Sequence, residues 1–177
     1  MAKKKTEGGE SKKTNGDGPP QGQSDPTSAK PASLAELSVL GQYVKDLSFE
    51  SPNAPKSLQG PGDNPQLKVG VNVKAVPVGD DTYEVALHLE VHARSDPGVI
   101  YNVELVYAAL FRLRGLPQNM LQPVLFVDCP TILFPFLRRV LADMVRDGGF
   151  PPLLLDPIDF GRLYAQNLSQ SQSTAKN

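Results

Sequence analysis

The chain has 177 residues, a formal net charge of −1 and one cysteine. This length fits one domain of ordinary size with a tail, and the near-neutral balance excludes an overall basic footprint for nucleic acid. One cysteine excludes an intramolecular disulfide framework, and no run of about 18 apolar residues or secretory h-region occurs. We therefore expect a cytoplasmic protein that does not span a membrane.

Residues 1–36 are rich in Lys, Gly, Ser, Thr, Pro, Gln and Asp and nearly lack large apolar side chains. Such a segment buries too little surface to offset the entropy of ordering, so we predict a disordered tail. Its weak positive bias leaves two interpretations open, a passive solubilising tail or an arm that touches RNA or lipid. We assign residues 37–170 to one folded domain and residues 171–177 to a second disordered tail.

Apolar residues then recur at every second position, which predicts strands. The first strand, QYVKDLSFES, runs into Pro52 and Pro55, which withhold ladder donors. Its period places Tyr43, Lys45, Leu47 and Phe49 on one face and Val44, Asp46, Ser48 and Glu50 on the other.

Three further segments continue this pattern. QLKVGVNVKAV and YEVALHLEVHA are separated by a VGDD turn signal, so we expect a hairpin. GVIYNVELVYAALFRLRG begins with polar residues on one face and ends apolar on both. A strand of this kind is covered on both sides, and another subunit is a candidate for the second cover.

Helical spacing replaces the alternation after Gly115. Prolines at 117, 123 and 130 make any helix there short or irregular, whereas TILFPFLRRVLADMVRDGG has helical spacing and ends at two glycines. FPPLLLDP is predicted to be extended, and Asp159 is a suitable N-cap for a last helix. Strands followed by helices indicate an α+β fold with an antiparallel sheet.

Candidate catalytic residues are few. His88, Glu90 and His92 share one strand face and could approach a metal, but Glu84 and Arg94 continue the same polar face, which favours a solvated surface. Cys129 has no histidine nearby in sequence to act as a base, and no phosphate-binding loop is present. We expect a protein that is not an enzyme and needs no cofactor or metal.

Apolar side chains exceed what one four-stranded sheet requires. The surplus lies on the 67–73 strand face, in the FPPLLL segment and along the 160–168 stripe. It indicates either an ordinary core or an oligomer interface or groove for an extended peptide.

Three motifs make a specific resemblance. YVKDLSFESPNAP at 43–55, CPTILFPFLRRVLADMVRDGG at 129–149 and FPPLLLDPIDFGRLY at 150–164 follow one another in this order. Over roughly residues 38–170 the chain resembles SecB, the protein-export chaperone family, and looks like an alphaproteobacterial member. The resemblance implies a SecB-like fold, with a four-stranded antiparallel sheet, a long helix and a C-terminal helix, assembled as a dimer of dimers.

The resemblance also implies a function. An ATP-independent chaperone would bind unfolded preproteins in the cytosol, keep them competent for translocation and deliver them to SecA. The partners would be preproteins, SecA and three further copies of the chain, without nucleic acid or direct membrane insertion, and any zinc would belong to SecA. An alternative is a SecB-like holdase that serves another client system, such as a toxin–antitoxin pair.

By resemblance, particular residues acquire roles. SecA binding falls on the exposed acids Asp46, Glu50 and Glu104. Client binding falls on apolar residues of the second strand and the last helix: Leu67, Val69, Val71, Phe160, Leu163, Tyr164 and Leu168. Two features depart from the family pattern, namely Asn102 where an apolar docking contact is expected and a C-terminus that lacks the usual acidic tail.

Overall fold

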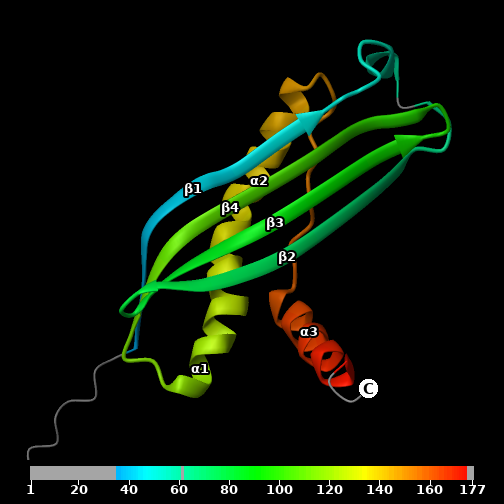
Figure 1. The fold of residues 1–177 in the computed structure, drawn as a ribbon. Helices are drawn as coiled ribbons and strands as arrows, with labels where there is room; N and C mark the ends of the chain where they lie inside the picture. The colour runs from blue at the N-terminus through cyan, green and yellow to red at the C-terminus, as the bar shows by residue number, and fades with distance from the viewer. Residues whose placement is uncertain (1–34, 61, 175–177) are drawn as a thin grey trace, which may run out of the picture. The chain divides into compact units, whose positions relative to one another are not determined.

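Four strands form one antiparallel sheet in the computed structural model, which describes residues 35–60 and 62–174 (Figure 1). They are β1 (Glu36–Glu50), β2 (Gln66–Gly79), β3 (Thr82–Ser95) and β4 (Gly98–Arg114), in the spatial order β1-β4-β3-β2. The predicted antiparallel sheet is confirmed, and so is the β2–β3 hairpin, whose turn residue Asp81 has a φ of 53°. The N-terminal tail predicted at 1–36 falls on residues outside the described part, apart from its last two.

The helical elements follow the sheet, except for a short 3-10 turn. This turn, η1 (Lys56–Gln59), lies between β1 and β2. The later elements are α1 (Gln118–Pro123), the π-helical turn η2 (Val124–Asp128), α2 (Cys129–Asp147) and α3 (Phe160–Thr174). Helix α3 continues past the predicted domain boundary at residue 170, and residues 175–177 are not described.

The segment Gln118–Asp147 is one long helix with a wider π turn at η2. It is long and apolar enough to cross a membrane by length and composition, a property that a buried core helix shares. Leu133, Leu137, Leu141 and Val145 are fully buried, so one side of this apolar helix packs against the sheet. The proline-rich stretch is irregular, as predicted, because Pro123 cannot donate a backbone hydrogen bond.

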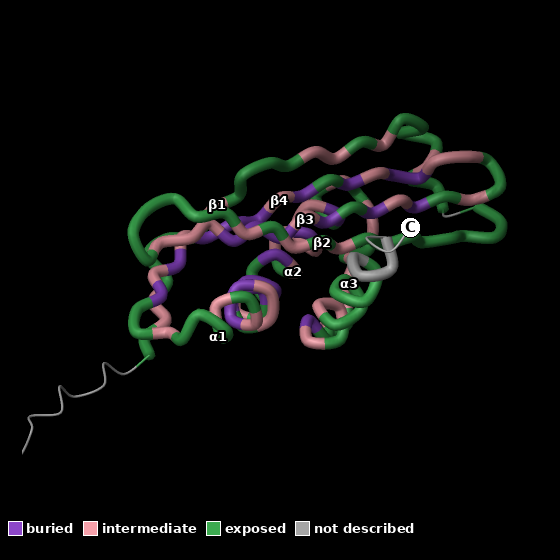
Figure 2. Tube along the Cα trace, turned by 60° about the horizontal axis from the view of Figure 1, so that its bottom comes forward, coloured by how far each residue is buried: buried purple, intermediate pink, exposed green. Residues whose placement is uncertain are grey.

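Helix α2 crosses β3 and β4 on one face of the sheet, which we call the inner face; the opposite side is the outer face (Figures 1 and 2). The buried core lies between α2 and the inner face. Inner-face side chains of the two central strands are almost fully buried, whereas those of the edge strands are more exposed: Leu67 is 49% exposed and Val44 is 43% exposed. The exposed part of the inner face therefore lies on the edge strands β1 and β2, beyond the reach of α2.

Strand β1 changes face twice because its pairing with β4 slips by one residue between Val39 and Gly41 and again between Val44 and Asp46. Residues paired across an antiparallel ladder share a face. Tyr43 pairs with Ala108 on the outer face, whereas Leu47 pairs with Leu105 on the inner face. The predicted common face for Tyr43, Leu47 and Phe49 is therefore wrong for Tyr43, because a bulge inserts one extra residue between them.

The ends of α2 and α3 match the sequence signals. Gly149 has a φ of 87°, and the backbone N–H of Phe150 donates to the carbonyl of Val145 at 3.2 Å, closing a Schellman-type C-cap. The Asp159 carboxylate accepts from the backbone N–H of Arg162 at 2.9 Å, which confirms the predicted N-cap. Between the helices, Arg138 donates to the Leu155 carbonyl at 3.1 Å and fastens the extended segment to α2.

Candidate functional site

The outer face brings together the three acids predicted to bind SecA. Asp46 pairs with Val106, Ser48 with Glu104 and Glu50 with Asn102, so all three acids lie on neighbouring rows of β1 and β4. The three carboxylates are exposed, and none takes part in an ion pair within the described residues. The structure thus presents them as an uncompensated negative surface.

Glu90 enlarges this surface and was not assigned to it from the sequence. It pairs directly with Glu104 across the β3–β4 ladder and is exposed. Directly opposed residues have Cβ atoms only about 5 Å apart, so two carboxylates there repel each other. The signal that could have found Glu90 is the hairpin register, which depends on pairing between strands rather than on any local motif. We call Asp46, Glu50, Glu90 and Glu104 the acidic stripe.

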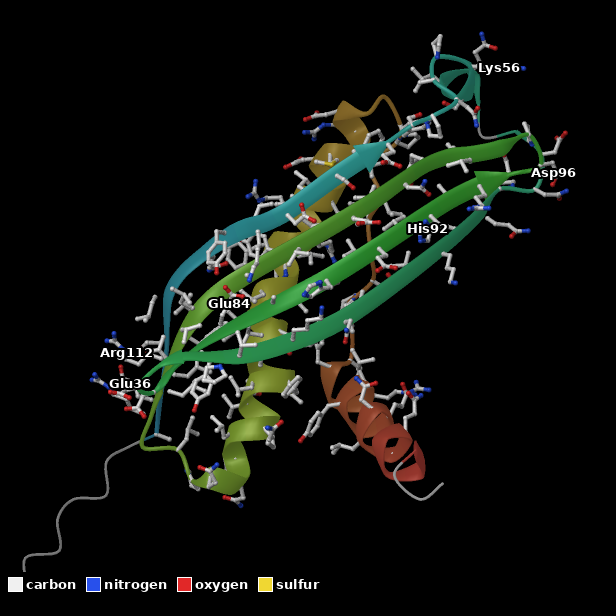
Figure 3. All side chains as sticks on the ribbon, in the orientation of Figure 1. Glu36, Lys56, Glu84, His92, Asp96 and Arg112 are labelled. Atoms are coloured by element: carbon white, nitrogen blue, oxygen red, sulfur yellow. The ribbon has the colours of Figure 1, made fainter. Side chains whose placement is uncertain are left out.

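Asn102, which departs from the family pattern, forms a hydrogen bond with a neighbouring side chain on the outer face. The Oδ1 atom of Asn102 lies 3.0 Å from Nδ1 of His92, its ladder partner on β3. This hydrogen bond holds a polar pair on the two central strands of the outer face, beside Glu50 and Glu104. Figure 3 shows His92 and Glu84 toward opposite ends of β3.

Glu84 anchors a separate polar cluster on the outer face. Tyr43, just before the second slip in β1, and Lys45, the extra residue at that slip, both donate hydrogen bonds to the Glu84 carboxylate. Lys45 and then Tyr43 lower the pKa of Glu84, and the Glu84 hydrogen bond raises the pKa of Tyr43 to about 12. The charge of Glu84 is thereby matched locally, unlike the charges of the acidic stripe.

An apolar pocket of about 570 Å³ opens on the inner side, at the end of the sheet that carries η1. It is lined by residues of the β1–β2 connection, the start of β2, strands β3 and β4 and the segment after α2, among them Leu58, Leu67, Ala93, Tyr101, Phe150 and Leu153. Its volume lies within the usual range of about 300–1,000 Å³ for ligand pockets. Apolar walls and an open mouth suit a side chain from an extended peptide.

The predicted client residues are distributed unevenly around this pocket. Leu67 lines it, and Val69 follows on the same inner face with 38% of its surface exposed. Val71 is partly buried against the core. On α3, Leu168 is exposed and Leu163 is partly buried, while Tyr164 stacks on Phe126 with ring centroids 5.9 Å apart. The α3 residues do not line the pocket, so the sheet and the helix provide separate apolar surfaces.

Phe160 departs from the predicted client role. Only 2% of its surface is exposed, and its ring meets Phe134 edge-on at a centroid distance of 6.0 Å. Its side chain therefore fixes α3 to α2 instead of facing a client. The first residue of the apolar stripe on α3 is therefore part of the core, whereas the later residues of the stripe are more exposed.

The alternative metal centre on β3 lacks the required geometry. Side chains on one face of a strand are spaced about 6.6 Å apart, which spreads His88, Glu90 and His92 along the surface. Within the described residues, no three His, Cys, Asp or Glu side chains are grouped to hold a metal ion. Burial, followed by Lys74 and Lys45, lowers the pKa of His88.

Cys129 is buried within the core, and burial raises the pKa of its thiol to about 12. The nucleophilic form of cysteine is the thiolate, which this environment strongly disfavours. Cys129 therefore serves packing at the start of α2.

An apolar pocket on the inner side of a sheet and an acidic stripe on its outer face are features typical of proteins that bind other proteins. The family model of the preprotein translocase subunit SecB matches residues 30–171. A protein-export protein SecB of Mesorhizobium japonicum is 48% identical over 150 residues, which cover 85% of this chain and 87% of the relative. The corresponding protein of Zymomonas mobilis is 51% identical over 137 residues, covering 77% and 83%. The chain belongs to the SecB family, as its motifs predicted.

A solved structure supports the fold. The SecB-like chaperone of Mycobacterium tuberculosis, in complex with a ChAD peptide from the HigA1 antitoxin, superposes with a TM-score of 0.53. The match covers 69% of this chain and 90% of that one, at 19% sequence identity. At this identity the likeness concerns the arrangement of strands and helices alone.

Proposed function

We propose that the protein is an ATP-independent export chaperone that binds unfolded preproteins and delivers them to SecA. The observation that carries this proposal is that the two faces of one sheet differ: exposed apolar side chains lie on the inner side and an acidic stripe lies on the outer face. Family membership and the protein-export names of the relatives support it. Membership in a chaperone family likewise favours binding over catalysis.

Client binding on the inner side follows from physical chemistry. An unfolded preprotein exposes apolar side chains, and burying apolar surface contributes roughly 25 cal/mol per Å². The pocket beside Leu67 and the exposed surface at Val69 and Leu168 offer several modest sites. Several weak contacts give a useful combined affinity while each remains reversible, which suits a chaperone that must release its client.

The assembly we propose is a dimer of dimers located in the cytoplasm. Val44 and Leu47 on the inner face of β1 are 43% and 38% exposed, and Phe136 on α2 is 40% exposed. Phe136 stacks on Tyr107 with a centroid distance of 6.4 Å, so these apolar side chains extend the core outward beyond α2. A second copy of the chain placed there would cover these exposed apolar side chains on the inner side.

Charge neutralisation on the outer face tests SecA delivery. The double variant Asp46→Ala/Glu50→Ala should weaken SecA binding and leave binding of an unfolded preprotein unchanged, because the carboxylates face away from the inner pocket. A matched control, Asp80→Ala/Asp156→Ala, removes the same charge from exposed connecting segments. Wild-type SecA affinity in the first double variant would disprove the docking assignment.

The antitoxin alternative has weaker support. Relatives named for protein export are 48% and 51% identical to this chain, whereas the structural neighbour bound to an antitoxin peptide is 19% identical. Capture of an antitoxin but no preprotein by the purified chain would reverse this preference.

A further inference from the structure

Basic side chains form a second stripe on the same outer face. Lys68 and Lys74 lie on β2, where they pair with His92 and Ala86, and Arg94 on β3 pairs with Gln66. This register makes Lys68 and Arg94 diagonal neighbours. Together with Gln66, Leu67 and His92 they line an open hollow of about 410 Å³. We call Lys68, Lys74 and Arg94 the basic stripe.

The basic stripe has no internal counter-charge. All three side chains are exposed. In the described part of the chain, the ion pairs are Lys45 with Glu84, Arg139 and Arg146 with Asp143, and Arg146 with Asp147. The basic stripe takes part in none of them, just as the acidic stripe takes part in none.

Distance separates Glu50, at the far end of the acidic stripe, from the basic stripe, whereas Glu90 is a diagonal neighbour of Lys68 and brings the two stripes together on β3. One row of the sheet runs from Glu50 through Asn102 and His92 to Lys68. Three inter-strand steps of about 4.8 Å separate its ends by roughly 14 Å. At physiological ionic strength the Debye length is about 8 Å, so Glu50 and Lys68 interact weakly with each other. Each stripe remains available to a partner that comes into contact with it.

We propose that the outer face docks its protein partner through both stripes at once, so that an acidic segment of the partner meets the basic stripe while a basic segment meets the acidic stripe. This inference rests on the proposed SecA docking. It adds that the docking surface of the partner carries both positive and negative charge and that the partner binds in one orientation. A partner turned by half a revolution would place like charges together, which penalises the wrong orientation.

A protein fits this arrangement better than a membrane. An anionic lipid surface carries one sign of charge, so it would attract Lys68 and Arg94 while repelling the acids on the same face. A folded protein can present both signs at a spacing of roughly 14 Å, which is the width of three inter-strand steps. The alternation of the stripes across the sheet therefore selects a protein occupant.

Charge reversal in the basic stripe provides the test. The association rate of purified SecA with the full chain should fall about tenfold at low salt in Lys68→Glu/Arg94→Glu, because exposed charges chiefly steer encounter. The neutral variant Lys68→Gln/Arg94→Gln should show a smaller decrease. The difference from wild type should shrink in 0.5 M salt, where screening is strong. Lys56→Glu/Arg162→Glu reverses two exposed charges away from the stripe and should leave the rate unchanged.

The outcomes separate this inference from the proposed function. If Asp46→Ala/Glu50→Ala weakens SecA binding while Lys68→Glu/Arg94→Glu binds at the wild-type rate, the two-stripe inference is overturned and SecA docking stands. If neither double variant changes binding, both fail. Co-sedimentation with phosphatidylglycerol vesicles provides a further arm. Vesicle binding that is lost in Lys68→Glu/Arg94→Glu, with an unchanged SecA rate, would assign the basic stripe to lipid and overturn the inference. Unchanged affinity for an unfolded preprotein confirms that each variant is folded.

Discussion

Neutralising either Glu90 or Glu104 should stabilise the fold while weakening docking. The two residues are directly paired across β3 and β4, which places their Cβ atoms about 5 Å apart. Two unit charges at 5 Å in water repel by roughly 0.8 kcal/mol, and screening at physiological salt reduces this to about 0.4 kcal/mol. Both side chains are exposed, so the lower figure is the relevant one. Glu90→Gln should therefore raise the free energy of unfolding by a few tenths of a kcal/mol.

A double-mutant cycle measures this repulsion. Urea unfolding of wild type, Glu90→Gln, Glu104→Gln and the double variant, at pH 8 and one protein concentration, isolates the pairwise term. The coupling should be repulsive and about 0.4 kcal/mol near physiological ionic strength. It should nearly vanish at 1 M salt, where the Debye length is about 3 Å. The same single variants should bind SecA more weakly than wild type, since each removes one charge from the acidic stripe.

Opposite signs for stability and docking are the diagnostic result. If the Glu90–Glu104 pair served folding, the protein would become less stable when either charge is removed. Attractive coupling, or zero coupling at low salt, would refute the reasoning about the register. If Glu90→Gln stabilises the fold but binds SecA as tightly as wild type, the repulsion between Glu90 and Glu104 is supported and Glu90 does not belong to the docking surface.

Three further predictions concern the core and pH. Phe160→Ala should lower the free energy of unfolding by about 3–5 kcal/mol, whereas the exposed Leu168→Ala should change it by about 0.5 kcal/mol or less; equal costs in urea unfolding would contradict the burial of Phe160. Gly148→Ala would place a Cβ 2.3 Å from Cζ of Phe49 and should lower the free energy of unfolding by about 1–3 kcal/mol. Adding Phe49→Leu should restore part of this stability, and no restoration would show that the clash with Phe49 is not the cause. His88 has a lowered pKa in the folded state, so the unfolded chain binds more protons; its stabilising contribution is complete above about pH 6.5 and is lost as pH falls through the folded pKa. His88→Gln should reduce the pH dependence of the urea midpoint between pH 7.5 and 5. An unchanged pH dependence would exclude His88 as the source of the stability loss at low pH.

Much of the fold was predictable because its signals are local. Alternating side chains located the strands, the two-residue turn before Thr82 fixed the hairpin, and Asp159 marked the start of α3. The motif resemblance supplied the arrangement of these elements. Two acids of the outer face were also placed together from the sequence, since Asp46 and Glu50 are four residues apart in β1 and lie on the same side of the bulge.

The remaining features depend on contacts between distant parts of the chain. Tyr43 was misplaced because the bulge at Lys45 reverses the alternation, and tyrosine suits either a core face or a polar network. Glu90 was missed because its neighbour Glu104 is reached through the register of β3 with β4. Phe160 was misassigned because a helical stripe does not reveal where burial begins along it.

The slip at Lys45 has a consequence for how this strand tolerates change over evolution. The Lys45 side chain is half exposed, so many amino acids would fit at that position without disturbing the core. Removing the residue altogether would make the pairing with β4 regular and leave Tyr43 and Leu47 on opposite faces, but Glu84 would lose the hydrogen bond that Lys45 donates. Selection at position 45 therefore acts on the partner of Glu84, whereas the register of the sheet on either side of it tolerates both a substitution and a deletion.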